Sequence, residues 1–411
     1  MLKRQNVITI TLLIVALVIL PARWVGVYAS SSLFVSTTGN DGNNCLSPGT
    51  PCKTIQAAVF KAADGDTINI AAGLYPGAVS LFQRKNLTFA GATGAAISDP
   101  GLPLGAAVVN MQLSENIRFH DLTFSGNPAG VEAIRIFTSS GISVTRSTIE
   151  HANLGFFINN SGVQISDSTV QDNGAGVRVD GGSAVTLNSA PFSPGTSTVQ
   201  RNGNGVIVRS GDFGMLGATI VQDNGVGING TGGLIRVCCQ DGLRKINDNN
   251  VGIQLKGVNL ELRGPLEMAG NRAWAIFMSG SFATISDRVT IHDNGAPETG
   301  AIAVTGGRLE LNGRGPNDID ISNNIGNGLL VTDGGTTRIF NTLISNNGAH
   351  GLRVEGLSVA RLFDTAVMKD NGGFDCSCAP NSVGRGDRSG VRRMFCPGFD
   401  QSPDPMPGGP N

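Results

Sequence analysis

The stretch that decides the fold is VQDNGAGVRVD, residues 170–180. On its own, the Asn-Gly step between aliphatic residues is typical of a tight β-hairpin. Close copies return, however, at 201–206 (RNGNGV), 223–228 (DNGVGI) and 248–253 (DNNVGI), and looser copies continue as far as residue 373. A phrase repeated at intervals of 22 to 30 residues predicts a solenoid, in which each copy forms the same corner of a successive coil.

Each repeat contains three short strands. One strand precedes the phrase, and in the second Val177 and Val179 alternate with Arg178 and Asp180, which is typical of a strand with one buried side. A third strand follows, and no repeat has helical periodicity. The units lack the leucine-rich-repeat pattern and are too short for propeller blades, so we predict an all-β parallel β-helix of about 12–13 coils.

The N-terminal end of such a solenoid needs a cap, because an exposed sheet edge pairs with other chains. In TIQAAVFKAA (54–63), apolar residues recur on one face of a helix, and Thr54 is a suitable N-cap. We therefore predict a capping helix here and a first strand over TINIAAGLY (67–75).

The segment FVSTTGNDGNNCLSPGTPCKTIQAAVFKAADGDTINIAAGLY (34–75) resembles the opening of secreted bacterial right-handed parallel β-helix repeat proteins of the pectate-lyase-like superfamily. The V-S-T-x-G-x-D start, the C…PC-x-TIQ-A helix, the GDTI strand and the A-G-x-Y turn support the likeness, and the repeats extend it to about residue 374. The resemblance implies a right-handed helix, an extracellular location and frequent carbohydrate binding. The superfamily includes lyases, hydrolases, epimerases and many non-enzymes, so fold alone does not settle activity.

The N-terminal residues 1–29 are interpreted as a signal peptide, with a basic start, an apolar run and a small-residue cleavage site at Ala29. The alternative is an uncleaved anchor helix; no later segment is apolar enough to cross a membrane. We therefore expect a chain secreted by a bacterium or held at its surface. The remaining segments are an N-terminal cap with a short helix (30–66), the β-helix (67–375), a Cys-containing C-terminal segment (376–397) and a disordered tail (398–411).

Seven cysteines in an exported chain predict disulfides. Cys45 and Cys52 bracket a turn-rich loop and form the predicted pair. The odd total leaves at least one thiol unpaired within the chain. The pairing of the others stays open: Cys238, Cys239, Cys376, Cys378 and Cys396.

One asparagine recurs at the same place in every copy of the phrase. Stacked carboxamides can bond from coil to coil in a ladder, and asparagine also tolerates left-handed backbone. A structural role is therefore the favoured interpretation of the column, which consists of Asn173, Asn202, Asn224, Asn249, Asn271, Asn294, Asn324, Asn347 and Asn371.

An acidic column precedes these asparagines and is interrupted by Arg201. Stacked carboxylates would attract cations, and a Ca²⁺ site between coils, with Asp223 and Asp248 as candidate ligands, is one interpretation. Aspartate is also an ordinary turn residue that bonds its own backbone, and this is the favoured interpretation. The column consists of Asp172, Asp223, Asp248, Asp293 and Asp370.

Outward residues beside the phrase are the candidates for chemistry. A uronate lyase needs a base such as Arg, and a glycosidase needs two carboxyl groups about 5–10 Å apart. The alternative is a row of surface salt bridges that contribute little. Ile207, Phe277 and Leu330 share the outward column, which hints at covering loops or an apolar ligand. The candidate catalytic residues, expected to converge across three coils, are Asp172, Arg178, Asp180, Arg201, Arg209 and Asp223.

Two hypotheses about function remain. The favoured one is a polysaccharide-binding, surface or structural protein without turnover. Sugar subsites of enzymes usually use aromatic side chains as platforms, and after signal removal only Trp274 and Tyr75 remain of the Trp and Tyr residues. The alternative is a polysaccharide lyase, glycoside hydrolase or epimerase acting on an acidic polysaccharide. The formal charge of -1 argues against a nucleic-acid partner. We expect a monomer, and interpret the four isolated histidines, His120, His151, His292 and His350, as surface or turn residues.

Overall fold

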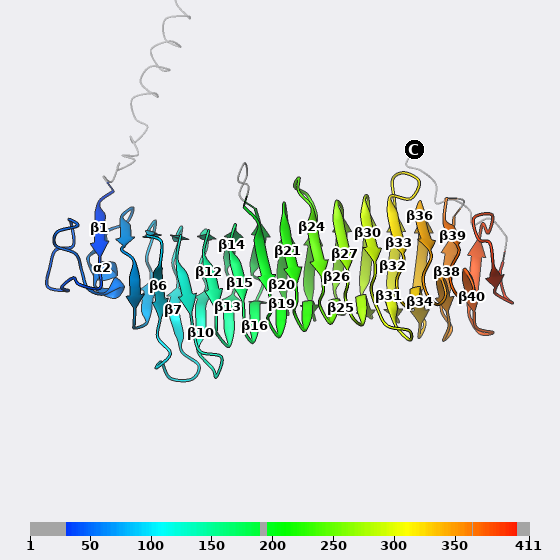
Figure 1. Cartoon of the computed structure of the whole chain (residues 1–411), viewed down its shortest axis with the longest axis horizontal. Coiled ribbons are helices and arrows are strands. Elements are labelled where there is room, and N and C mark those ends of the chain that lie inside the picture. Colours follow the sequence, from blue (N-terminus) through cyan, green and yellow to red (C-terminus); the bar gives the residue numbers. More distant parts are fainter. Residues whose placement is uncertain (1–29, 190–194, 364, 401–411) are drawn as a thin grey trace, which may run out of the picture. The chain divides into compact units, whose positions relative to one another are not determined.

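The computed structural model describes residues 30–189, 195–363 and 365–400. The expected signal peptide and residues 401–411 of the expected tail lie outside these ranges. The chain divides into Met1–Ser30 and Ser31–Asn411, and the second unit contains the elements described below. In it, parallel strands form three sheets of stacked coils (Figure 1), which confirms the predicted all-β parallel β-helix and its number of coils. Among the described residues, no helix is long and apolar enough to cross a membrane.

The three sheets are named A, B and C. Among the described residues, sheet A contains, in spatial order, β1 (Ser32–Val35), β2 (Thr67–Ile70), β5 (Thr88–Gly91), β8 (Arg118–His120), β11 (Ile142–Thr145), β14 (Gly162–Ser166), β17 (Ala184–Asn188), β20 (Gly211–Met215), β23 (Gly233–Val237), β26 (Asn259–Arg263), β29 (Phe282–Ser286), β32 (Arg308–Asn312), β35 (Thr336–Phe340), β38 (Val359–Leu362) and β41 (Val383–Gly386). Sheet B contains β3 (Gly73–Tyr75), β6 (Ala95–Ser98), β9 (Thr123–Ser125), β12 (Thr148–Glu150), β15 (Thr169–Gln171), β18 (Ser197–Gln200), β21 (Thr219–Gln222), β24 (Arg244–Asn247), β27 (Leu266–Ala269), β30 (Val289–His292), β33 (Ile319–Ser322), β36 (Thr342–Ser345) and β39 (Val367–Lys369). Sheet C contains β4 (Val79–Phe82), β7 (Ala107–Gln112), β10 (Glu132–Phe137), β13 (Leu154–Asn159), β16 (Ala175–Asp180), β19 (Asn204–Val208), β22 (Val226–Gly230), β25 (Val251–Lys256), β28 (Trp274–Ser279), β31 (Gly300–Thr305), β34 (Asn327–Thr332), β37 (Leu352–Val354), β40 (Cys376–Cys378) and β42 (Met394–Phe395).

Each coil runs from sheet A to sheet B to sheet C. The repeated phrase forms the corner between sheets B and C, so Asp172 and Asn173 lie between β15 and β16. Gly176 is required there, because a Cβ at this position would lie 2.6 Å from the carbonyl oxygen of Gly205 in the next coil. Strands stack in register, with Val177 opposite Val206.

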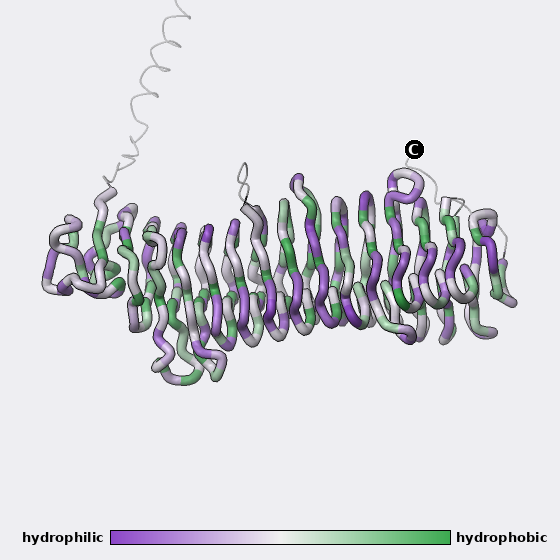
Figure 2. Tube along the Cα trace, viewed as in Figure 1, coloured by the Kyte–Doolittle hydropathy of each residue, from purple (hydrophilic) through white to green (hydrophobic). Residues whose placement is uncertain are grey.

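The core is the inside of the coils. Val177 and Val179 are 1% and 0% exposed, whereas Arg178 and Asp180 between and after them reach the surface, as predicted. Figure 2 shows hydrophilic and hydrophobic segments alternating along the coils. Because every inward residue rests on its equivalents in neighbouring coils, hydrophobic burial continues along the whole stack.

The predicted asparagine ladder is present. Asn173 donates a hydrogen bond from Nδ2 to Oδ1 of Asn202 at 3.0 Å, and its backbone N donates to the same oxygen at 3.0 Å. The pattern repeats through Asn371, which donates instead to Oδ1 of Asp375 at 2.8 Å. Asp375 is fully buried and also accepts a hydrogen bond from the backbone N of Arg393 at 2.9 Å. The carboxylate therefore ends the ladder.

Left-handed backbone lies one residue before each ladder asparagine, not at the asparagine itself. Asp172 has φ 55°, and the equivalent Arg201 has φ 53°. Asp, Asn and His tolerate this conformation better than most residues, which explains the acidic column as a column of turn residues. Arg201 shows that the position does not require a carboxylate.

Serine ladders at the other two corners were not predicted. Between sheets C and A, the backbone N of Ser139 donates to Oγ of Ser161 at 3.0 Å. Between sheets A and B, the backbone N of Ser147 donates to Oγ of Ser168 at 3.1 Å. Serine is common in turns of all kinds, so its recurrence gives a weak sequence signal.

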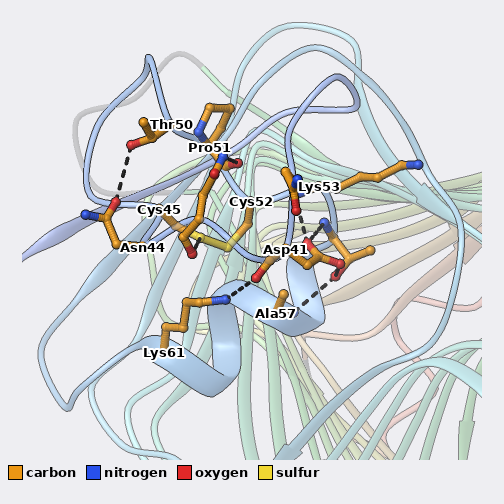
Figure 3. Close-up of a disulfide and its surroundings, with 12 residues drawn as sticks. Asp41, Asn44, Cys45, Thr50, Pro51, Cys52, Lys53, Ala57 and Lys61 are labelled. Carbon is orange, nitrogen blue, oxygen red and sulfur yellow. Dashed lines mark hydrogen bonds between the residues drawn. A yellow bond between two sulfur atoms is a disulfide. The ribbon is translucent and has the colours of Figure 1, made fainter.

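The N-terminal cap contains the predicted helix, α2 (Ile55–Lys61), with Thr54 as its N-cap. Asp41 holds the cap together by accepting hydrogen bonds from the backbone N atoms of Lys53 and Thr54, both at 2.8 Å (Figure 3). The expected single strand over 67–75 is wrong in detail, since β2 and β3 are separate strands and β1 precedes them.

The C-terminal strands extend the stack past its expected end at residue 375. Cys376 in β40 pairs with Leu352 in β37 of the preceding coil. Val383 in β41 likewise pairs with Val359 in β38. The sheets therefore continue into the segment that was expected only to contain cysteines.

Candidate functional site

The outward face of sheet C holds three of the six candidate residues. Arg178 donates hydrogen bonds to Oδ2 of Asp180 from Nε at 2.9 Å and from Nη2 at 2.6 Å. Its guanidinium also lies over the ring of Phe157, 4.7 Å from the centroid. Arg209 is exposed beyond the end of β19. Because Arg178 is satisfied by its own strand and the neighbouring ring, its charge is already compensated.

The other three candidates lie at the corner between sheets B and C. Arg201 donates to both carboxylate oxygens of Asp172 at 2.9 Å, and this hydrogen-bonded guanidinium lowers the pKa of Asp172. Asp223 is exposed at the equivalent turn position. Asp172 lies at the corner and Arg178 within β16, and each is paired with a different partner, so the six candidates do not form one patch.

The predicted calcium ligands, Asp223 and Asp248, also occupy this corner with left-handed backbone. Among the described residues, no group of three or more His, Cys, Asp and Glu side chains is arranged to hold a metal ion. Their geometry is that of turn residues.

The outward apolar residues of sheet C are neither covered nor fully exposed. Ile207, Phe277 and Leu330 are all half-buried. Phe277 lies beside Trp274, with ring centroids 6.4 Å apart. These residues therefore form separate contacts along the sheet.

A basic and aromatic cluster on sheet A was missed by the sequence analysis. Arg338, Arg361 and Arg385 lie opposite one another on the adjacent strands β35, β38 and β41. Two residues further along the chain, Phe340 at the end of β35 and Phe363 just after β38 stack with ring centroids 3.6 Å apart and an interplanar angle of 14°. We name these five residues the arginine–phenylalanine face.

Arg338 and Arg385 have little acidic compensation in the part of the chain that the structure describes. Nη1 of Arg338 lies 3.9 Å from Oε1 of Glu310, and that carboxylate also pairs with Arg308. Arg385 makes no side-chain hydrogen bond or ion pair with the residues that the structure describes, and it is exposed. Adjacent strands are about 4.8 Å apart, so positive charges are stacked at the spacing of the coils.

The sequence signal for this face is the recurrence of RIFNT (338–342) as RLFDT (361–365). The Asp-Asn-Gly phrase aligns only the residues at the corner between sheets B and C. The RIFNT and RLFDT segments begin on sheet A, where the repeats are otherwise dissimilar, so that alignment does not reveal their likeness.

A hollow of about 430 Å³ lies on sheet B between β27, β30 and β33. Glu267 and Asp320 line it from strands on either side of Thr290. Burial raises the pKa of Glu267, but hydrogen bonds from Asn247 and Lys245 outweigh it and lower the pKa overall. Asp320 makes no hydrogen bond or ion pair with the described residues, and its Oδ1 is buried.

Histidines lie mostly in local contacts, as expected of surface and turn residues. Nδ1 of His292 lies 2.6 Å from Oδ2 of Asp293, and Nδ1 of His120 lies 2.8 Å from Oδ2 of Asp121. His151 occupies the left-handed turn position. Burial lowers the pKa of His350, whose ring is parallel to that of Phe374.

The cysteines form three disulfides in the described residues. The predicted pair, Cys45 and Cys52, is confirmed (Figure 3). The pairs left open by the sequence are Cys238 with Cys239 and Cys378 with Cys396. Cys376 is the unpaired thiol, and burial raises its pKa to about 12, so it is protonated and unreactive at neutral pH.

Comparisons with known proteins agree with this architecture. A family model described as "Right handed beta helix region" matches residues 85–190. The A-module of the Azotobacter vinelandii mannuronan C-5 epimerase AlgE4 is similar in structure, with a TM-score of 0.50 and 18% identity over 85% of this chain and 94% of that chain. The AlgE6 A-module of the same organism has a TM-score of 0.46 and 17% identity over 85% and 93% of the two chains.

An alginate lyase from Paenibacillus sp. str. FPU-7 is less similar, with a TM-score of 0.32 and 13% identity over 91% of this chain and 99% of that chain. No curated protein matches the chain in sequence. The chain has the fold of a right-handed parallel β-helix.

Proposed function

We propose that the protein binds an acidic polysaccharide, without turning it over, along the arginine–phenylalanine face. The observation that supports this most strongly is the register of Arg338, Arg361 and Arg385 on consecutive strands. Two like charges at this spacing repel by about 1 kcal/mol in water and by more near a protein surface. A polymer with regularly spaced carboxylates would relieve that repulsion along the whole row.

The chemistry of the five side chains suits such a polymer. A guanidinium binds a carboxylate through two parallel hydrogen bonds, which gives orientation as well as affinity. Phe340 and Phe363 offer apolar surface beside the arginines, against which the C–H groups of a sugar ring can pack. The similar fold of a mannuronan C-5 epimerase module makes mannuronan a suitable first probe.

The test is calorimetric titration of the full chain with oligomannuronate, oligogalacturonate and the neutral cello-oligosaccharide of the same length. We expect binding of at least one uronate oligomer and none of the neutral one. Arg361→Gln and Arg385→Gln should each weaken binding at least tenfold, the value of about one to two charge-assisted hydrogen bonds. Arg353→Gln, which removes an exposed arginine paired with Glu355 on sheet C, is the matched control and should bind as the wild type does.

The absence of turnover is tested on the same uronate oligomers. After prolonged incubation with the protein, mass spectrometry should recover them at their original length, without unsaturated products, and NMR should show unchanged uronate stereochemistry. Cleavage or epimerisation that survives Arg353→Gln and is lost in Arg361→Gln would replace the binding proposal with a catalytic one.

A second candidate function is glycoside hydrolysis in the hollow on sheet B. Glu267 and Asp320 lie two strands apart, about 9.6 Å by strand spacing, which is near the upper end of the separation for two carboxyl groups that act on opposite sides of a glycosidic bond with inversion. The lowered pKa of Glu267 suits a base, and Asp320 is the second carboxyl group of the pair. New reducing ends from a neutral oligosaccharide panel, lost in Glu267→Gln and in Asp320→Asn, would establish it.

We also propose that the protein is exported. Three disulfides in the described residues favour an oxidising compartment, and the predicted signal peptide supplies a route. N-terminal sequencing of the protein from its native host should begin at Ser30, and a start at Met1 would oppose the signal-peptide interpretation. The expected monomer stays a prediction.

A further inference from the structure

A second hollow lies in the middle of sheet A, away from the arginine–phenylalanine face. It has a volume of about 350 Å³ and is lined by outward residues of β17, β20 and β23. Its centre is Gly214, which lies opposite Thr186 on one neighbouring strand and Arg236 on the other. The missing side chain of Gly214 therefore opens the space between two ordinary side chains.

Gly214 is not required by the backbone. A Cβ built there would meet only Oγ1 of Thr186 at 3.9 Å and the carbonyl oxygen of Val185 at 4.0 Å, which are ordinary contacts, and its φ lies outside the left-handed region. It is also the only glycine in the outward register from Gln164 on β14 to Arg385 on β41. A glycine inside a strand weakens the strand and often marks a place where a ligand approaches closely.

One wall of the hollow is apolar. It consists of Leu216 and the disulfide between the neighbouring residues Cys238 and Cys239, whereas Leu234 lies beside Asp212 at the other end of the hollow. Cys238 is fully buried, whereas Cys239 is exposed. Both cysteines line the hollow.

The opposite wall is polar. The carboxylate of Asp212 is exposed and makes no hydrogen bond or ion pair with the described residues. Nε of Arg236 lies 3.5 Å from Oε2 of Glu261, and both side chains are about half exposed. Asp212 therefore lies across the hollow from the disulfide, and Arg236 lies between them beside Gly214.

We propose that this hollow binds one neutral hexopyranose residue. The C–H face of the ring would lie on the Cys238–Cys239 disulfide and Leu216, and its hydroxyl groups would bond to Asp212 and Arg236. A sugar ring has this division into an apolar face and a polar edge. The unpaired carboxylate of Asp212 disfavours a uronate, and Arg236 already faces Glu261.

This site is independent of the proposed acidic-polysaccharide face. Arg236 and Arg338 belong to β23 and β35, which are four strands apart in sheet A, or about 19 Å by strand spacing. The two sites also differ in chemistry, since one is a hollow with an exposed carboxylate and the other a row of guanidinium groups.

The test is saturation-transfer NMR with the full chain and four probes: methyl β-D-glucopyranoside, methyl β-D-galactopyranoside, methyl α-D-mannopyranoside and methyl α-D-galacturonide. We expect transfer to the ring C–H protons of at least one neutral glycoside. Gly214→Val, whose Cβ makes only ordinary contacts and whose methyl groups occupy the hollow, should weaken binding at least tenfold. Thr284→Val, at the equivalent outward position three strands away, is the matched control and should leave binding unchanged.

Two further variants keep the outcome interpretable. Asp212→Asn should weaken the neutral glycosides even if the valine variant folds poorly, and circular dichroism shows which variants are folded. Arg361→Gln should change nothing here, so failure of the acidic-polysaccharide proposal is distinguished from failure of this one. The proposal is overturned if no neutral glycoside gives transfer, if the galacturonide binds best, or if both Gly214→Val and Asp212→Asn bind as the wild type does.

Discussion

At the scale of single residues, the fold depends on which corner residues can satisfy buried backbone groups. Each ladder asparagine is buried and donates along the stack while its oxygen accepts from the coil before it. Asparagine is suited to this because its carboxamide has two donors and an acceptor. The neighbouring position needs only left-handed backbone, which is why Asp172 and Arg201 are both found there.

Asn249 is the residue at which this account is tested. It is 0% exposed, and its Oδ1 accepts from the backbone N of Asn224 at 3.0 Å. Asn249→Ala leaves that buried N–H without an acceptor, so we expect a loss of about 3 kcal/mol in the free energy of unfolding, measured in urea. Asn250→Ala removes an exposed amide from the next position and should cost less than about 0.5 kcal/mol. Equal effects of the two substitutions would contradict the ladder's role.

At the scale of elements, the cap joins the N-terminal loop to α2 through one carboxylate. Burial raises the pKa of Asp41, but hydrogen bonds from Thr54 and Lys53 outweigh it and lower the pKa below its ordinary 3.8. In addition, Nζ of Lys61 donates to the backbone oxygen of Asp41 at 2.6 Å. The ionised form of Asp41 therefore stabilises the cap.

The pH dependence of the cap follows from the direction of this shift. A carboxylate whose folded-state pKa is depressed contributes stability above its unfolded pKa and loses it as the pH falls through the folded value. The free energy of unfolding of the wild type minus that of Asp41→Asn should therefore be largest above about pH 4 and shrink in more acidic solution. A difference that stays constant down to the acid limit would show that Asp41 does not titrate with folding.

Particular elements show what the sequence could and could not predict. The second strand of the repeat and the ladder corner were predicted because Val177, Val179 and the asparagines recur in register. The serine ladders were not, because a serine in a turn has many possible partners. Cys378 can pair with Cys396 because β40 lies beside β42 in sheet C. That neighbourhood is set by the three-dimensional coil and does not appear in the sequence.

At the scale of the whole solenoid, the register of the coils decides which outward residues meet. The candidates chosen from the sequence lay close along the chain, yet Asp172 lies at the corner before β16 whereas Arg178 lies on β16 itself. Arg338, Arg361 and Arg385 are separated by more than twenty residues along the chain and lie side by side. In a β-helix, neighbours on one face are one coil apart in sequence, so a surface site consists of residues from successive coils.

The most direct test of the central claim is a crystal structure of the full chain with a uronate oligosaccharide. We predict a sugar chain lying across β35, β38 and β41, with carboxylates on Arg361 and Arg385 and a ring against Phe340 or Phe363. An oligosaccharide bound instead on sheet C over Arg178, or in the hollow between Glu267 and Asp320, would contradict the claim.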